Sequence, residues 1–214
     1  MSGHKYWYKR GLKDGLPIGL GYLAVSLALG ISASRAGMTA VQATITSLLI
    51  NASAGEYAGF TAIAAGATYL EVTIVEAVAN ARYLLMSCAL SQKLPASATL
   101  GQRMLGGFYT TDEIFGASVS VPDKLDIFYT CGLATMAAPG WALGTFLGVV
   151  MGDVLPLRVI SALSVGLYGM FIAIFIPPAK KSRIILGLVI ISFAASYFFN
   201  TLAMFAAIYS SFKA

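Results

Sequence analysis

The chain has few charged residues. Asp, Glu, Lys and Arg make up 11% of its 214 residues, and 58% of the residues are hydrophobic. Soluble domains contain about 25% charged residues, and a soluble protein of this size could not bury so much apolar surface. A helix of about 20 apolar residues crosses the hydrocarbon core of a bilayer. Five stretches without a charged residue reach that length and indicate a membrane protein: residues 15–34, 36–55, 127–152, 159–179 and 184–212.

Histidine and cysteine are also scarce, which argues against several kinds of site. His4 is the single histidine, and Cys88 and Cys131 both lie in apolar stretches. The chain therefore lacks the spacing of a zinc site or a disulfide framework, and it contains no His-Glu-x-x-His or Gly-x-Ser-x-Gly motif. We expect no catalytic residue, no metal ion and no cofactor, and the sequence disfavours an intramembrane enzyme.

The positive charges lie at loops and ends. The formal net charge of +5 therefore indicates membrane sidedness rather than nucleic-acid binding, because cytoplasmic segments of membrane proteins are rich in Lys and Arg. We expect a basic cytoplasmic tail over residues 1–13 and one integral membrane domain over residues 14–214, located in the cell membrane. The first apolar run lacks a signal-peptide cleavage site, so we expect it to be retained as a span.

The apolar pattern predicts an all-α, polytopic membrane protein with about seven transmembrane helices. The second segment is too long and too polar for one simple helix, because small and polar residues run from Asn51 to Gly59. This favours a broken helix or a re-entrant turn, from which transporters build substrate sites. The alternative is a helix that packs closely through Gly55 and Gly59. The expected spans cover residues 16–34, 39–67, 69–91, 104–121, 127–152, 157–176 and 184–209.

The loops leave the sidedness open. Residues 92–104 resemble a loop that contains Lys93 and Arg103, and residues 122–126 resemble a turn. Seven crossings would place Lys93 and Arg103 opposite the basic amino end, in conflict with the positive-inside rule. The segment 104–121 either crosses or only dips into the membrane, and a double crossing by the second segment would also change the sides.

Arg82 is the most informative residue, because it lies inside an apolar stretch. A guanidinium in the bilayer costs a few kcal/mol and faces a protein partner or a water-filled cavity. On a helix, Arg82 shares a face with Glu71 but lies too far from it to touch. Glu56, Asp112, Asp153 or a substrate carboxylate is the expected partner. The alternative is a structural clamp on the carbonyls of a helix break.

Other polar residues lie in similarly apolar surroundings. Glu76 and Asn80 are four residues apart and share a helix face. A buried carboxyl at Glu56 would suit proton coupling or the binding of a substrate amine, and a structural acid is the alternative. Asp112 and Glu113 either function in the site or cap a short helix, and Glu71 marks a helix start. The candidate substrate-binding or coupling residues are Glu56, Tyr57, Asn80, Arg82, Asp112 and Glu113.

Glycines recur at every fourth position near the end of the span 127–152. They form one nearly straight helix face, and such a face allows a second helix to approach closely in lipid. The neighbour is either another span or a separate subunit. The expected helix-packing residues are Gly140, Gly144, Gly148 and Gly152.

Several motifs occur in an order that resembles the AzlC-type branched-chain amino-acid permeases. The resemblance covers residues 11–155, and the last two spans match only in hydropathy. The motifs are Asp14-Gly-Leu-Pro-Ile-Gly-Leu-Gly-Tyr22, the Asn-x-Arg signature at 80–82, Thr111-Asp112-Glu113, and Trp141 followed by the glycines.

The resemblance implies a secondary exporter of branched-chain amino acids that works with a small hydrophobic subunit of the AzlD type. One departure is that Glu56 stands where the family usually has a glutamine, which adds a titratable group. Arg82 and Glu56 suit the carboxylate and the amine of a zwitterion. The competing hypothesis is a non-transporting membrane scaffold or assembly subunit, for which the glycine face would be the working surface.

Overall fold

The computed structural model describes residues 3–122, 124–152, 162, 172, 176, 179–180 and 182–211. These residues form an all-α fold, as predicted, and contain no strand. The chain divides into two units, residues 1–168 and 169–214, and each is described by itself. The helices are α1 (Gly3–Arg35), α2 (Ala40–Ile50), α3 (Ser53–Ala64), α4 (Tyr69–Ala79), α5 (Arg82–Lys93), α6 (Leu100–Phe108), α7 (Asp112–Val119), α8 (Ile127–Met151) and α10 (Arg183–Ser211).

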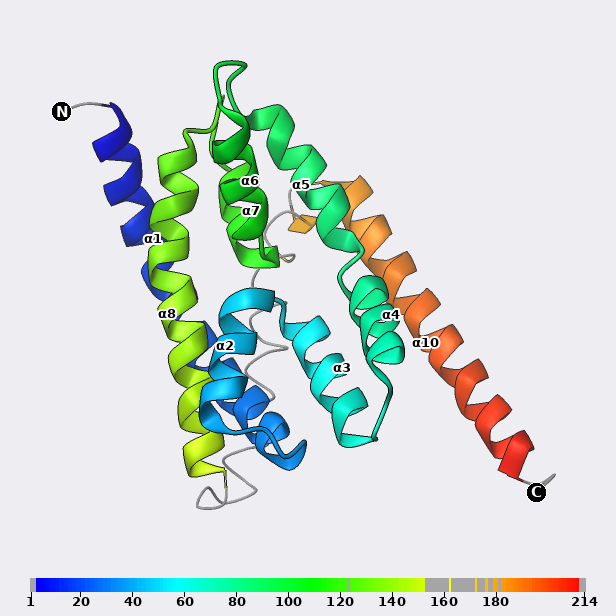
Figure 1. The fold of residues 1–214 in the computed structure, drawn as a ribbon. Helices are drawn as coiled ribbons and strands as arrows, with labels where there is room; N and C mark the ends of the chain where they lie inside the picture. Colours follow the sequence, from blue (N-terminus) through cyan, green and yellow to red (C-terminus); the bar gives the residue numbers. More distant parts are fainter. Residues whose placement is uncertain are drawn as a thin grey trace. The chain divides into compact units, whose positions relative to one another are not determined.

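Two long helices, α1 and α8, form the scaffold of the first unit (Figure 1). Both are long and apolar enough to cross a membrane, and α4 with α5 makes a third candidate, bent by 45° at its centre. The two long helices run parallel, because successive positions along α1 meet successive positions along α8. We call the end of the unit where both begin the proximal end, and the other the distal end. Residues 3–13, expected as a tail, form the first turns of α1.

Glycine lets these two helices approach closely. A Cβ built on Gly15 would lie 2.9 Å from Leu133 Cα, and one built on Gly148 would lie 2.9 Å from Gly30 Cα. Real side chains do not pack so tightly, so only glycine fits at these positions. The structure thus places α1 against the glycine face of α8. The close-approach positions are Gly11, Gly15, Gly19 and Gly30 on α1 and Gly132, Gly140, Gly144 and Gly148 on α8, while Gly152, after the end of α8, meets α1 only at Ile31.

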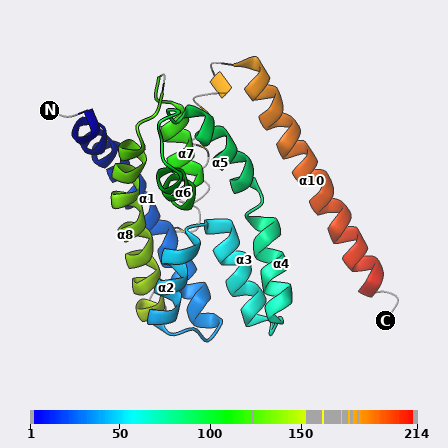
Figure 2. The ribbon, with the colours of Figure 1, turned by 45° about the horizontal axis from the view of Figure 1, so that its top comes forward.

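The second segment is a helical hairpin made of α2 and α3. The turn lies at Asn51, whose backbone is left-handed (φ 49°). The two helices have 11 and 12 residues, so each is about 17 Å long, roughly half of the ~30 Å hydrocarbon core. Both outer ends lie at the distal end, toward the bottom of Figures 1 and 2. The predicted break is therefore confirmed. The close packing offered as its alternative is also present, because Gly55 and Gly59 lie against Glu76 of α4.

A second hairpin, α6 with α7, enters from the opposite end. Arg103 of α6 donates to Ser91 Oγ at 2.7 Å, and Lys93 Nζ donates to the Val119 carbonyl at 2.7 Å. The start of α6 and the end of α7 therefore both lie beside the end of α5, at the proximal end. The helices have 9 and 8 residues, too few to cross. The segment 104–121 dips into the fold rather than spanning it, and the expected loop 92–104 is shorter, since α6 begins at Leu100.

The segment 69–91, expected as one span, is a candidate span that is broken at its centre. The helix stops at Asn80 and restarts as α5 at Arg82. The Asn80 side chain donates from Nδ2 to Glu76 Oε2 at 2.8 Å, in the turn before the break. Asparagine favours helix ends because its short polar side chain competes for local hydrogen bonds. Arg82 thus occupies the first position of a helix rather than the middle of one.

The two hairpins remove the conflict over sidedness. Because neither hairpin crosses, the chain crosses only twice between the amino end and the loop that contains Lys93, once through α1 and once through the α4–α5 pair. This loop is therefore proximal, and Lys124 Nζ donates to the Gln92 carbonyl there at 3.0 Å. The positive-inside rule predicts that the proximal end is cytoplasmic. In the described part of the first unit, the basic residues near the proximal end are His4, Lys5, Lys9, Arg10, Lys13, Lys93, Arg103 and Lys124, whereas Arg35 lies at the distal end.

The second unit contains α10, a helix of 29 residues that agrees with the predicted span 184–209. The predicted span 157–176, apart from residues 162, 172 and 176, and the candidate Asp153 lie outside the described residues.

The glycine contact predicts that bulk on this face will separate the scaffold helices. Gly144→Leu and Gly148→Leu should each destabilise the protein by about 1–3 kcal/mol or more, because the added atoms meet backbone atoms of α1 that cannot move aside. Thermal unfolding in detergent, followed by size-exclusion chromatography, measures the loss. Gly101→Leu on α6 is the matched control, since a Cβ there meets nothing within 4 Å. An equal loss in the control would contradict the assignment.

The hairpin arrangement predicts which loops share a side of the membrane. In a background with Cys88→Ser and Cys131→Ser, single cysteines at Ser97 and Ala65 place one thiol in an exposed loop at each end. A membrane-impermeant maleimide should label Ala65→Cys in intact cells and Ser97→Cys only after permeabilisation. Labelling of Ser97→Cys but not of Ala65→Cys in intact cells would show that the α2–α3 segment crosses, and labelling of both would show that the α4–α5 pair does not cross.

Candidate functional site

Three helices begin inside the first unit rather than at its ends. α3, α5 and α7 each start directly after a break in the chain, at residues 53, 82 and 112. Helix amino ends carry a partial positive charge and free N–H groups. The first turns at these breaks carry Glu56, Arg82, Asp112 and Glu113. The breaks therefore concentrate the charged residues that the sequence had singled out in three separate segments.

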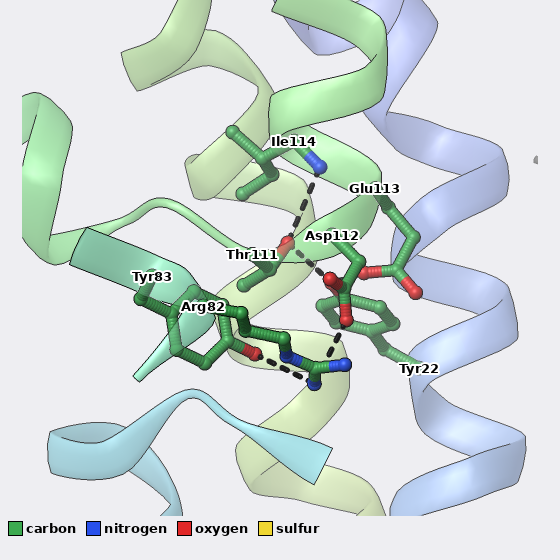
Figure 3. Close-up of polar contacts among 7 residues, drawn as sticks. All are labelled: Tyr22, Arg82, Tyr83, Thr111, Asp112, Glu113 and Ile114. Carbon is green, nitrogen blue, oxygen red and sulfur yellow. Dashed lines mark hydrogen bonds and ion pairs between the residues drawn. The ribbon is translucent and has the colours of Figure 1, made fainter. Parts of the chain in front are cut away.

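Arg82 forms an ion pair with Asp112. Nη2 of Arg82 lies 3.0 Å from Oδ2 of Asp112, and the side chains are 37% and 18% exposed (Figure 3). The guanidinium also lies 5.1 Å from the ring centroid of Tyr83 and 3.4 Å from its hydroxyl. Arg82 Nε is buried and has no hydrogen-bond partner among the described residues. Asp112, one of the partners considered from the sequence, is thus in contact with Arg82, and within the described structure the guanidinium keeps unused donor capacity.

Glu113 is buried beside this pair, and Tyr22 of α1 holds it. The Tyr22 hydroxyl is in hydrogen-bond contact with Glu113 Oε2 and lies 2.6 Å from Thr111 Oγ1. Thr111 is the N-cap of α7 and accepts from the Ile114 N–H at 3.2 Å (Figure 3). The capping role thus belongs to Thr111. Glu113 is 9% exposed and faces α1 rather than the surface.

Glu56 lies in a second cluster with groups from α2 and α8. It is completely buried. Oε2 accepts from Trp141 Nε1 at 2.8 Å, and Oε1 is in short hydrogen-bond contact with Ser47 Oγ. Ser47 Oγ also lies 2.7 Å from Thr145 Oγ1, which donates to the Trp141 carbonyl at 3.2 Å. These four residues attach the α2–α3 hairpin to the scaffold.

Asn80 and Glu76 face α3 next to Glu56. Modelling a Cβ on Gly55 brings it 2.5 Å from Asn80 Oδ1 and 2.7 Å from Glu76 Oε2, so glycine is required for this approach. Asn80 Oδ1 is buried and finds no hydrogen-bond partner within the part of the chain that the structure describes. The break in the α4–α5 span therefore leaves an unused acceptor close to the start of α3.

The two clusters meet through one aromatic contact. The rings of Tyr22 and Trp141 pack edge to face with centroids 5.0 Å apart. Together the described residues around the breaks contain one arginine and four carboxylic acids, and each acid in lipid needs donors, a proton or a cation. A site with this excess of acids can accept positive charge. The five groups are Arg82, Glu56, Glu76, Asp112 and Glu113.

Not every candidate belongs to the clusters. Tyr57 follows Glu56 by one residue, about 100° around the helix, and is 57% exposed. Glu71 forms the capping box of α4 with Thr68, as expected for a helix start. Among the described residues, no group of three or more His, Cys, Asp or Glu side chains could hold a metal ion.

Four residues of the clusters were not among the sequence candidates. Ser47 and Thr145 sit in apolar stretches, where a hydroxyl commonly bonds to its own helix. Tyr22 and Trp141 lie in the motifs that resemble the family, but nothing in their spacing showed that they meet. Contacts between residues 85 to 119 positions apart are set by the packing of α1 on α8, which the sequence does not display.

Broken helices, re-entrant hairpins and charged groups at the breaks form an architecture that membrane transporters share. The chain matches the family described as AzlC protein over residues 17–155, more than half of its length. It therefore belongs to the AzlC family, which is associated with branched-chain amino-acid transport, and the family resemblance of the sequence is confirmed.

Two relatives are named as membrane proteins. An uncharacterized membrane protein of Archaeoglobus fulgidus is 29% identical over 179 residues, covering 83% of this chain and 78% of the relative. The inner membrane protein YgaZ of Escherichia coli is 26% identical over 150 residues, covering 68% of this chain and 61% of the relative. The aligned region thus spans less than two thirds of the Escherichia coli protein. No solved structure matches significantly.

The Tyr22 contact predicts a cost for removing one hydroxyl. Tyr22→Phe takes the donor away from buried Glu113 and Thr111, so the protein should lose about 1–3 kcal/mol of stability. Thermal unfolding of the purified protein measures this loss. Tyr57→Phe makes the same chemical change at an exposed position on α3 and should alter stability by less than about 0.5 kcal/mol. Equal effects of the two variants would contradict the role of Tyr22.

Proposed function

We propose that this chain is the large subunit of a secondary transporter that exports branched-chain or similarly apolar amino acids across the cell membrane. The observation that carries the proposal is the partly exposed Arg82–Asp112 pair at the breaks of two helices. The family supports the substrate class. A small AzlD-type membrane subunit, expected from the family resemblance, is part of the proposal.

The pair matches the two charges of an amino acid. Arg82 offers a planar guanidinium with unused donors, which suits a carboxylate bidentately. Asp112, and Glu113 behind it, offer negative charge to the amine. Binding of the amino acid would replace the Arg82–Asp112 ion pair with two ion pairs, one between Arg82 and the substrate carboxylate and one between Asp112 and the substrate amine. Both charges of the substrate would therefore be paired inside the membrane. The amino ends of α5 and α7 add favourable partial charge for the carboxylate.

The hairpins supply the elements that would open the site to either side. The α2–α3 hairpin lies on the distal side of the breaks and the α6–α7 hairpin on the proximal side. Movement of one hairpin at a time would expose the pair to one face of the membrane, as alternating access requires. Arg82–Asp112 and Tyr22–Glu113 hold the proximal hairpin, and Glu56 with Ser47 and Trp141 holds the distal one.

The alternative function, a scaffold or assembly subunit without transport, is less well supported, because the surface that it would use is already covered. It would use the glycine face of α8 as its working surface, whereas α1 covers that face at Gly140, Gly144 and Gly148. Efflux of labelled leucine, isoleucine and valine from proteoliposomes, with and without the small subunit, distinguishes the two functions. The absence of any amino-acid flux in both preparations would overturn the transport proposal.

Arg82→Ala should reduce amino-acid efflux at least tenfold while the protein remains inserted. A charged hydrogen-bonding partner is worth about 1.5–3 kcal/mol, and the change also leaves Asp112 unpaired. Arg82→Lys should restore little, because Lys lacks the bidentate fork. Efflux at limiting substrate is measured together with the protein content of the membrane.

Arg10→Ala is the control for Arg82→Ala. Arg10 faces Asp14 at 3.7 Å, and both side chains are 39% exposed, so this pair resembles a surface ion pair of small worth. The control should keep efflux within about twofold of wild type. Full efflux by Arg82→Ala would exclude Arg82 from the substrate site.

A further inference from the structure

The two clusters differ in whether a substrate can reach them. Arg82 and Asp112 are 37% and 18% exposed, whereas Glu56 is completely buried. Both oxygens of Glu56 are already engaged, Oε1 with Ser47 Oγ and Oε2 with Trp141 Nε1. A substrate amine would have to displace these contacts and separate α2 from α8. The geometry therefore argues against Glu56 as the ligand of an amine, although its chemistry allows that role.

The number of hydrogens available to the hydrogen bonds around Glu56 indicates that Glu56 binds a proton rather than an amine. Three oxygen–oxygen contacts follow one another, from Glu56 Oε1 to Ser47 Oγ, then to Thr145 Oγ1, then to the Trp141 carbonyl. Each needs one hydrogen to be a hydrogen bond. Ser47 and Thr145 supply one hydrogen each. The third comes from Glu56 when it carries a proton, which donates to Ser47, so that all three contacts are satisfied together.

The described residues around Glu56 include no positive charge that could replace that proton. α2 presents Ser47, α8 presents Trp141 and Thr145, and α4 presents Asn80 and a further acid, Glu76, against Gly55 and Gly59. α1 approaches through Tyr22, which packs on Trp141. In the part of the chain that the structure describes, no Lys, Arg or His lies within ion-pair distance of Glu56. A bare carboxylate here would be a buried charge without a counter-ion.

We propose that Glu56 binds a proton within the network of Ser47, Thr145 and Trp141, and that this proton is coupled to substrate movement. The coupling rests on the proposed transport function, whereas the binding of a proton does not. When the proton is present, the network ties the α2–α3 hairpin to α8. When the O–H bond of Glu56 breaks, the proton passes to water on the open side and the carboxylate keeps the electron pair. One contact of the chain then lacks its hydrogen until a proton returns, while the other contacts still hold the hairpin.

Glu56→Gln tests the proposal because it imitates the protonated state. Its NH2 group donates to Ser47 and its oxygen accepts from Trp141 Nε1, but it cannot release a proton. In proteoliposomes with a trapped pH indicator, substrate-driven proton movement should fall to background. Exchange of labelled for unlabelled amino acid, which needs no net proton movement, should stay within about twofold of wild type. Proton movement that persists in the variant would overturn the coupling role.

Glu71→Gln is the matched control. It makes the same chemical change on α4, at an exposed capping position where glutamine also serves. It should leave both exchange and proton movement unchanged. If the wild-type protein moves no amino acid at all, the proposed transport function is refuted. If the wild type transports and proton movement persists in Glu56→Gln, only the coupling role of Glu56 is refuted.

Infrared difference spectroscopy tests proton binding without transport. The purified wild type should show the carbonyl stretch of a protonated carboxylic acid that is absent in Glu56→Gln and changes when pH is varied. Should that variant fail to fold, Ser47→Ala removes the partner of the acid and should shift the same band. The absence of any such band in the wild type, or a band untouched by both substitutions, would refute proton binding by Glu56.

Discussion

The close contact between α1 and α8 is the interaction on which the rest of the first unit depends. Lipid provides no hydrophobic drive for two apolar helices to associate, so packing must do so. Glycines on both helices bring the backbones together over most of the length of α8. The resulting pair presents Tyr22 on one helix and Trp141 with Thr145 on the other. Each hairpin is attached to this scaffold by hydrogen bonds to one of those helices.

The hairpins solve the problem of irregular backbone in a membrane. Peptide groups at a break lose their helical partners and must be satisfied inside the protein. Here the breaks face one another, and the first turns after them carry side chains that bond across helices, such as Glu56 with Trp141 and Glu113 with Tyr22. The same breaks bring Arg82 and Asp112 within 3.0 Å. The interruption of three helices thus also brings an arginine and an acid close enough to pair inside the first unit.

Much of this fold was accessible from the amino-acid pattern. The membrane class follows from hydropathy, the break near Asn51 from its polar neighbours, and the glycine face from its four-residue spacing. The break at Asn80 was missed, because the hydropathy from Tyr69 to Lys93 continues across it. The hairpin character of α6 and α7 was also left open, since a short apolar segment has the same composition whether it crosses or returns.

The candidate site shows the same division. The sequence identified Arg82, Asp112, Glu113 and Glu56 because charged residues in apolar stretches are costly, and that cost depends on local composition alone. Which of them pair was decided only by the tertiary structure, because Arg82 and Asp112 are 30 residues apart and Glu56 and Trp141 are 85 apart. Hydropathy is a property of each segment, whereas an ion pair in a membrane exists only where two backbones are held close. The positions of Tyr22, Ser47 and Thr145 beside buried acids follow from the parallel packing of α1 on α8 and from the two turns, which no single segment specifies.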